Sequence, residues 1–128
     1  MATSIETSRQ ELLRDLLKQV SRLFYTTLVV VPADVRDQVS LAYLFARAAD
    51  TIADTELIDR PRRLDLLSQL KAQFVSDQIA WTQVREIQQA VGPIQQNAAE
   101  RSLLKRLADC FKLFQAFHRT IGAAYNGL

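Results

Sequence analysis

Glycine and proline, the residues that most often interrupt a helix, are scarce in this sequence. Three Gly and three Pro are spread over 128 residues, whereas ordinary usage would make them about 12% of a chain. No Gly or Pro occurs between Pro32 and Pro61, so one uninterrupted element of roughly twenty residues fits there. With 48% apolar and 23% charged residues, the chain has enough apolar side chains for a core. We therefore predict a single all-α unit of about five to six helices.

Charge and composition exclude several other classes of protein. The sixteen Lys and Arg residues are scattered along the chain and leave a net charge of +2 against fourteen Asp and Glu residues, so we expect no nucleic-acid binding. No run approaches the ~20 apolar residues of a membrane-spanning helix. The single cysteine, Cys110, indicates a reducing compartment and a small core residue rather than a metal or redox site. We accordingly predict a cytoplasmic protein.

Hydrophobic residues recur at helical spacing along most of the chain. Ser8 with Glu11 and Asn97 with Glu100 are capping-box patterns, and each predicts the start of a helix. Further helices are expected over residues 21–31, 34–54, from Pro61 onward, and over 77–91. The helix from Pro61 carries a Leu/Phe stripe of Leu64, Leu67, Leu70 and Phe74, with Lys71 beside it. The helix from Asn97 continues through Leu104, Leu107, Phe111 and Phe114.

Four polar side chains share one side of the helix expected over residues 34–54. At about 100° per residue, their spacings of four, three and four residues place them on one polar stripe: Tyr43, Arg47, Asp50 and Asp54. The opposite side carries Leu41, Leu44, Phe45, Ala48 and Ile52, and the flank carries Val39, Ala42, Ala46, Ala49 and Ala53. Because this helix is apolar over most of its circumference, we predict that it is buried and that its stripe points into the interior or into a cleft.

Two carboxylates at this place need a compensating charge. Asp50 and Asp54 are four residues apart, where like charges repel by roughly 0.2–0.5 kcal/mol even on an exposed helix, and the macrodipole disfavours negative charge near the helix C-terminus. Carboxylates without nearby His or Cys favour Mg²⁺, which completes its coordination with water and phosphate oxygens. Arg47, one turn earlier, suits the same phosphate. The alternative is that Arg47 pairs with Asp50 and that this end of the helix faces water.

Two segments resemble the N-terminal motifs of the squalene and phytoene synthase family. Ser21-Arg22-Leu23-Phe24-Tyr25 is similar to the family's Ser-Arg-Ser-Phe element, with Leu23 in place of the second serine. Residues 41–55, Leu-Ala-Tyr-Leu-Phe-Ala-Arg-Ala-Ala-Asp-Thr-Ile-Ala-Asp-Thr, resemble its first aspartate-rich motif. The order and the separation of the two segments match as well. The Asp-Thr-Ile-Ala-Asp-Thr sequence is more similar to squalene synthases than to phytoene synthases.

The resemblance implies an isoprenoid-synthase-type helical bundle that joins two farnesyl diphosphates head to head through presqualene diphosphate, with NADPH as the reductant if squalene is the product. It implies that Asp50 and Asp54 hold Mg²⁺ against the substrate diphosphate. It further implies that Arg47 binds the diphosphate and that Tyr43 belongs to the active-site wall, so both are candidate catalytic residues. The remaining candidate substrate-binding residues are Ser21, Arg22 and Phe24.

The family also has a second aspartate-rich motif, which this sequence lacks, because only Glu86, Glu100 and Asp109 follow Asp77 among the acidic residues. We therefore expect residues 1–128 to be the N-terminal portion of one synthase-like domain, inactive without its C-terminal half. The oily product of such an enzyme also leaves peripheral membrane association open. Two alternatives remain, namely a non-catalytic helical interaction module and a phytoene-synthase-type enzyme that uses geranylgeranyl diphosphate.

Overall fold

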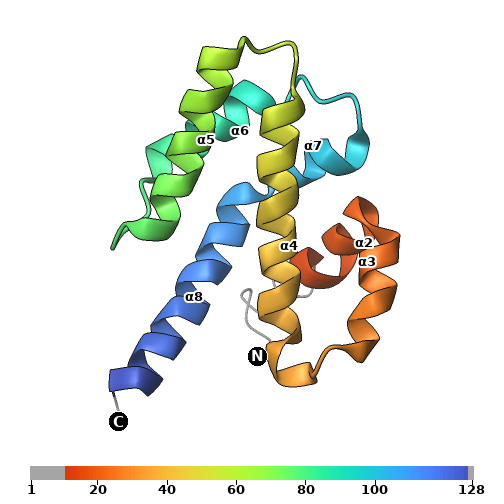
Figure 1. The fold of residues 1–128 in the computed structure, drawn as a ribbon, viewed down its shortest axis with the longest axis vertical. Coiled ribbons are helices and arrows are strands. Elements are labelled where there is room, and N and C mark those ends of the chain that lie inside the picture. The colour runs from red at the N-terminus through yellow and green to blue at the C-terminus, as the bar shows by residue number, and fades with distance from the viewer. Residues whose placement is uncertain (1–10, 127–128) are drawn as a thin grey trace.

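The computed structural model describes residues 11–126, and the side chains of residues 13–117. This part of the chain is all-α and contains no strand. Its elements are η1 (Glu11–Leu16, a π-helical turn), α2 (Leu17–Val20), α3 (Arg22–Thr27), η2 (Leu28–Val30, a 3-10 turn), α4 (Ala33–Asp54), α5 (Arg60–Val75), α6 (Trp81–Val91), α7 (Ala98–Lys105) and α8 (Leu107–Asn126). The long helix α4 stands in the centre, with α5 and α8 on one side and α2, α3 and α7 on the other (Figure 1).

Helix α4 buries its predicted core face and exposes more of its circumference than predicted. The buried residues include Leu41, Leu44, Phe45, Ala48 and Ile52. On the flank, however, Ala42, Ala46 and Ala53 are exposed. The prediction of a buried helix was therefore wrong for this side, because α5, α7, α8 and the N-terminal elements pack against the opposite side of α4. An apolar flank of small side chains is left facing solvent.

The N-terminal elements pack against α4 and α7. The leucines Leu13, Leu16 and Leu17 are buried there. Ser21 has extended backbone angles (φ −154°, ψ 100°) and separates α2 from α3, and its hydroxyl oxygen accepts a hydrogen bond from the Phe24 N–H at 3.1 Å. Residues 22–30 are helical as predicted. The Ser8 half of the first predicted capping box lies outside the described residues.

Helix α5 has Pro61 in its first turn, as predicted, but its core face is centred differently from the predicted stripe. Leu66 and Leu70 are buried, whereas Leu64 is 53% exposed and Phe74 is 37% exposed. The predicted stripe is therefore wrong at Leu64, whereas Leu67, Leu70 and Phe74 lie against the core. The reason is chemical, since the buried row of this helix consists of Leu66, Leu70 and the polar Gln73.

Gln73 is buried because its side-chain amide is fully hydrogen bonded. Nε2 donates to the Gln69 carbonyl and to Gln83 Oε1, both at 2.7 Å. Oε1 accepts from the Ala80 N–H at 2.8 Å, at the start of α6. A buried polar group with all its partners costs little. Gln73 therefore joins α5 to α6 at a position where apolar periodicity would look for a hydrocarbon side chain.

The single helix predicted from Asn97 onward is divided into α7 and α8. Arg106 leaves the helical region with φ −96° and ψ 10°, and α8 continues in a different direction (Figure 1). Gln88 of α6 accounts for the break, because its Nε2 donates to the carbonyls of Leu104 at 3.1 Å and Lys105 at 2.8 Å. Carbonyls in the last turn of a helix lack intrahelical partners, and Gln88 supplies them from outside.

Four phenylalanines, Phe45, Phe74, Phe111 and Phe114, close the core between α4, α5 and α8. The ring centroids of Phe45 and Phe111 are 4.7 Å apart, and those of Phe45 and Phe74 are 4.8 Å apart at an interplanar angle of 89°. Such tilted and edge-on contacts are the favoured arrangements of aromatic rings. None of the helices in the part of the chain that the structure describes is both long enough and apolar enough to span a bilayer.

Candidate functional site

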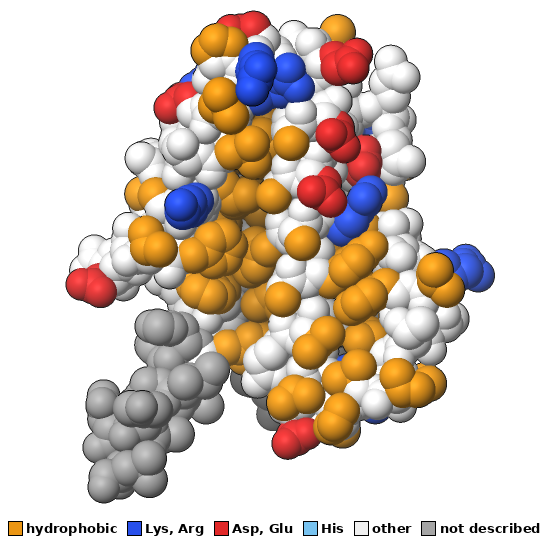
Figure 2. All heavy atoms as spheres, viewed as in Figure 1, with side chains coloured by type: hydrophobic (Ala, Val, Ile, Leu, Met, Phe, Trp, Pro, Cys, Tyr) orange, Lys and Arg blue, Asp and Glu red, His pale blue; other side chains and the backbone are white. Residues whose placement is uncertain are grey.

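The polar stripe of α4 lies at the border between the core and solvent. Tyr43 and Arg47 are half-buried, and Asp50 and Asp54 are exposed. Figure 2 shows acidic side chains gathered beside a basic one on this face, with hydrophobic side chains extending away from them over the molecule. The four residues share one side as predicted. The stripe opens to solvent in the described residues. Of the two predicted orientations, into the interior or into a cleft, the one into the interior was therefore wrong.

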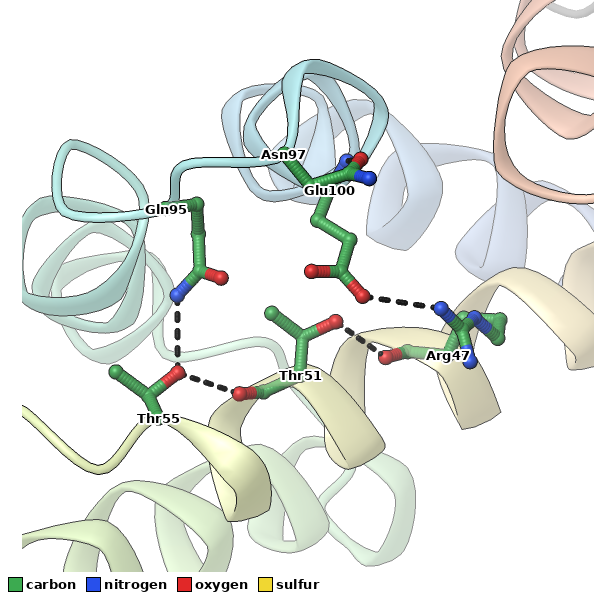
Figure 3. Close-up of polar contacts among 6 residues, drawn as sticks. All are labelled: Arg47, Thr51, Thr55, Gln95, Asn97 and Glu100. Atoms are coloured by element: carbon green, nitrogen blue, oxygen red, sulfur yellow. Dashed lines mark hydrogen bonds and ion pairs between the residues drawn. The ribbon is translucent and has the colours of Figure 1, made fainter.

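Arg47 pairs with a residue from another helix. Its Nη2 donates to Glu100 Oε1 on α7 at 3.0 Å (Figure 3). The alternative pairing of Arg47 with Asp50 was therefore wrong as to the partner. Glu100 also illustrates a capping box that is half formed: its N–H donates to Asn97 Oδ1 at 3.0 Å, while its carboxylate turns to Arg47.

A series of hydrogen bonds links the C-terminal end of α4 to the segment between α6 and α7. The Thr51 hydroxyl donates to the Arg47 carbonyl at 2.9 Å, and the Thr55 hydroxyl donates to the Thr51 carbonyl at 2.5 Å. Gln95, in the segment between α6 and α7, donates to Thr55 Oγ1 at 2.9 Å (Figure 3). Thr51 and Thr55 are both buried. The helix end that carries the two aspartates is thus fixed to the segment preceding α7.

The cation at the C-terminal end of α4 is Arg63. Its Nη1 donates to the Ala53 carbonyl at 2.6 Å. A cation at a helix C-terminus interacts favourably with the macrodipole, which is the compensation that Asp50 and Asp54 lack on their own helix. The sequence did not indicate Arg63 at this position, because nothing in it shows that the first turn of α5 lies against the end of α4.

The other predicted substrate-binding residues lie on and before α3. Phe24 stacks on Tyr43, with ring centroids 4.1 Å apart and ring planes at 13°. Ser21 caps α3 through its hydroxyl oxygen, and Arg22 is exposed. The structure therefore brings Phe24 against the stripe, and its role in substrate binding stays a prediction. Ser21 has a local structural task that would also hold Phe24 in place.

The stripe offers two carboxylates that could serve as ligands of Mg²⁺. Asp50 and Asp54 lie one helical turn apart and are open to solvent. Among the residues that the structure describes, no group of three or more His, Cys, Asp or Glu is arranged to hold a metal ion. Mg²⁺ is commonly bound by one or two carboxylates together with water and substrate phosphate oxygens. Two exposed carboxylates beside an arginine match that pattern.

Comparison with known proteins assigns the chain to a family. The family model of squalene/phytoene synthase matches residues 17–125. The chain belongs to the squalene/phytoene synthase family. It is 40% identical over 63 residues to the bifunctional lycopene cyclase/phytoene synthase of Blakeslea trispora, a match that covers 49% of this chain and 10% of that protein. The chain thus spans a small part of that relative's length. No solved structure matches.

The sequence did not indicate the contacts that three residues make near the stripe, namely Arg63, Gln95 and Glu100. Glu100 was identified, but as the reciprocal partner of Asn97. The signal that Gln95 and Glu100 share is their position around the Asn97 cap, which places Glu100 in the first turn of α7 and Gln95 just before that helix. That signal shows where α7 begins and does not show which helix α7 contacts.

Proposed function

We propose that this chain forms one wall of the active site of an enzyme that condenses two prenyl diphosphates head to head. The observation that carries the proposal is the side-by-side placement of Arg47, Asp50 and Asp54 on α4 in a member of the squalene/phytoene synthase family. In this proposal the second acidic motif lies in polypeptide outside residues 1–128.

Asp50 and Asp54 would hold Mg²⁺, and Arg47 would bind the substrate diphosphate. When bound, Mg²⁺ would offset the negative charge that develops on the departing diphosphate. Arg47 contributes a permanent positive charge to the same group, with guanidinium N–H donors suited to phosphate oxygens. Charges already in place before the reaction lower the barrier without reorganisation.

The stacked pair of Phe24 and Tyr43 would form the apolar side of the site. Departure of an allylic diphosphate leaves a carbocation, and the face of an aromatic ring attracts a cation. The exposed alanine flank of α4, Ala42 and Ala46, continues this side with small apolar side chains. Such a surface excludes water from a prenyl chain laid along it, and water is the reagent that would destroy the cation.

Two substrates are consistent with these groups. The Asp-Thr-Ile-Ala-Asp-Thr sequence favours farnesyl diphosphate, condensed toward presqualene diphosphate and reduced by NADPH if squalene is formed. The matching relative is named as a phytoene synthase, which favours geranylgeranyl diphosphate as the second candidate. Both use the same diphosphate chemistry at Arg47, Asp50 and Asp54.

The test is an assay of the natural polypeptide that contains residues 1–128. It is incubated with Mg²⁺ and either farnesyl or geranylgeranyl diphosphate, with and without NADPH, and the hydrocarbon and diphosphate products are separated by chromatography. We expect Asp50→Asn to lower kcat/KM by about a hundredfold or more, the usual effect of removing one charge-stabilising group. Removal of Mg²⁺ by a chelator should abolish turnover.

Asp65→Asn provides the matched control, since Asp65 is an exposed aspartate on α5 that pairs with Arg62 at 2.7 Å. It should leave kcat/KM unchanged. Equal activities of the Asp50→Asn and Asp65→Asn variants would contradict the assignment of Asp50. The absence of product with both substrates, together with no Mg²⁺-dependent binding of diphosphate, would instead favour a non-catalytic interaction module.

A further inference from the structure

The ion pair between Arg47 and Glu100 is better shielded than a comparable pair elsewhere in the chain. In both Arg47–Glu100 and Arg62–Glu86, Nη2 lies 3.0 Å from Oε1. The side chains of Arg47 and Glu100 are 34% and 27% exposed, whereas those of Arg62 and Glu86 are 37% and 44% exposed. The Arg47–Glu100 pair is therefore somewhat less exposed to the solvent that screens ion pairs.

Several contacts of α7 and of the segment before it fix the position of Glu100. Asn97 caps the first turn of α7 through the Glu100 N–H, and the next turn is anchored in the core by Leu103 and Leu104, both 0% exposed. Gln95 ties the preceding segment to Thr55 at the end of α4. The carboxylate also lies at the helix N-terminus, where the macrodipole favours its negative charge. The position of Glu100 relative to α4 is therefore fixed on several sides.

Arg47 has a long side chain whose only hydrogen bond within the described residues is to Glu100. Its Nε is buried and has no hydrogen-bond partner within the described residues. The hydrogen bond to Glu100 is thus the polar contact that orients the guanidinium over the stripe. A carboxylate occupies one edge of a guanidinium and leaves the other donors available, so the pairing does not exhaust Arg47.

We propose that Glu100 is a positioning residue for the anion site of α4: it holds the guanidinium of Arg47 beside Asp50 in the orientation that receives a diphosphate. This inference rests on the proposed function. Figure 3 shows how Glu100 reaches Arg47 from α7 while Gln95 reaches Thr55 from the preceding segment. Small displacements of a binding group lower reactivity steeply, so the loss of this support is expected to be felt at the site.

The carboxylate of Glu100 has a second, opposite effect on an anion. Its own negative charge repels a diphosphate, so a purely electrostatic role predicts that its removal tightens binding. Positioning predicts that removal weakens binding. Glu100→Gln separates the two, because its amide oxygen still accepts from Arg47 Nη2 while the charge is gone.

The experiment uses the natural polypeptide that contains residues 1–128, with inorganic diphosphate and Mg²⁺ as the probe. Calorimetry gives the Kd of diphosphate for the wild type, Glu100→Ala, Glu100→Gln, Arg47→Ala and the double variant Arg47→Ala/Glu100→Ala. Glu86→Ala is the control, since it breaks the matched ion pair away from the stripe. KM and kcat for the prenyl diphosphates and the Tm are measured on the same proteins.

Glu100→Ala should raise the Kd about tenfold, the usual effect of removing a group that orients a binding residue. Glu100→Gln should restore the Kd to within about threefold of the wild type, because the hydrogen bond remains. Glu86→Ala should leave it unchanged. Glu100→Ala should add nothing in the Arg47→Ala background, because coupled residues are not additive.

Tighter binding by Glu100→Ala, additivity with Arg47→Ala, or an equal effect of Glu86→Ala would each overturn the assignment. If the coupling is found but neither prenyl diphosphate is turned over, the proposed function fails and the positioning role stands. If turnover depends on Asp50 but not on Glu100, the proposed function stands and the positioning role fails. A wild type that binds no diphosphate with Mg²⁺ contradicts both.

Discussion

Phe24 and Tyr43 lie face to face, with ring centroids 4.1 Å apart and planes at 13°. The pair fastens α3 to the middle of α4, one turn before Arg47. Both rings are partly buried against the core, so one stack serves the packing of the N-terminal elements and also forms part of the candidate site. We therefore expect substitutions at these two positions to change the stability of the protein as well as the candidate site.

The stacked rings of Phe24 and Tyr43 should be energetically coupled in folding. We expect a double-mutant cycle of Phe24→Leu and Tyr43→Leu to give an interaction of about 0.5–1.5 kcal/mol in the free energy of unfolding, the usual value for an aromatic pair. Urea denaturation followed by circular dichroism measures it. A cycle of Tyr25→Leu with Tyr43→Leu is the control, and a coupling of equal size there would contradict the assignment.

The register of α5 can be tested with two leucines on the same helix. Leu66→Ala should lower the free energy of unfolding by about 2–5 kcal/mol, because Leu66 is 0% exposed and its removal leaves a cavity. Leu64→Ala should change it by less than about 0.5 kcal/mol, because Leu64 is 53% exposed. Equal losses for the two variants in urea denaturation would show that the core face of α5 is misassigned.

The break between α7 and α8 depends on Gln88. Gln88→Ala leaves the Leu104 and Lys105 carbonyls without the hydrogen bonds that they receive at 3.1 and 2.8 Å, which should cost about 1–2 kcal/mol of stability. Gln89→Ala, at an exposed neighbouring position, should be neutral within about 0.5 kcal/mol. Thermal denaturation of the two variants compares them directly, and a neutral Gln88→Ala would remove Gln88 as the cause of the break.

Cys110 should resist thiol reagents in the folded protein. Burial raises the pKa of its thiol to about 12, with the charge of Asp109 as a further cause. Only roughly one thiol in ten thousand is then ionised at pH 8. Labelling by a disulfide reagent should therefore follow unfolding and be fast only in denaturant, and fast labelling of the native protein would contradict this burial.

The raised pKa of Cys110 also makes the stability of the protein depend on pH. The folded state keeps the proton of Cys110 to a higher pH than the unfolded state does, so stability should be lost as the pH rises from about 9 towards about 12. Cys110→Ala should flatten that part of the pH profile. The measurement is the free energy of unfolding at several alkaline pH values, with the wild type alongside.

The helical spacing of apolar residues within single segments made part of this fold predictable. The core face of α4 follows from Leu41, Leu44 and Ile52 alone, because a repeat on one helix depends on nothing outside it. The composition of the stripe follows in the same way, and the resemblance led to Phe24, which the structure places against Tyr43. The roles assigned to Arg47, Asp50 and Asp54 remain predictions.

What the sequence could not predict depends on contacts between distant segments. The glutamine at position 73 looks like a surface residue until Gln83 and Ala80 are folded against it. The direction of Arg47 depends on Glu100, 53 residues later. The exposed flank of α4 is a further example, since an alanine row is compatible with either a buried or an open helix face.

The Arg47–Glu100 contact also bears on the order in which the chain can assemble. It closes a loop of 53 residues, whereas the Gln73–Gln83 contact closes one of 10. For a flexible chain the longer closure costs about 1.5 kcal/mol more in conformational entropy. If the hairpin of α5 and α6 forms first, most of that loop is already ordered, and α7 reaches α4 across a much shorter free segment. The anion site of α4 would then be completed late, after the part of the chain that lies between its two halves has folded.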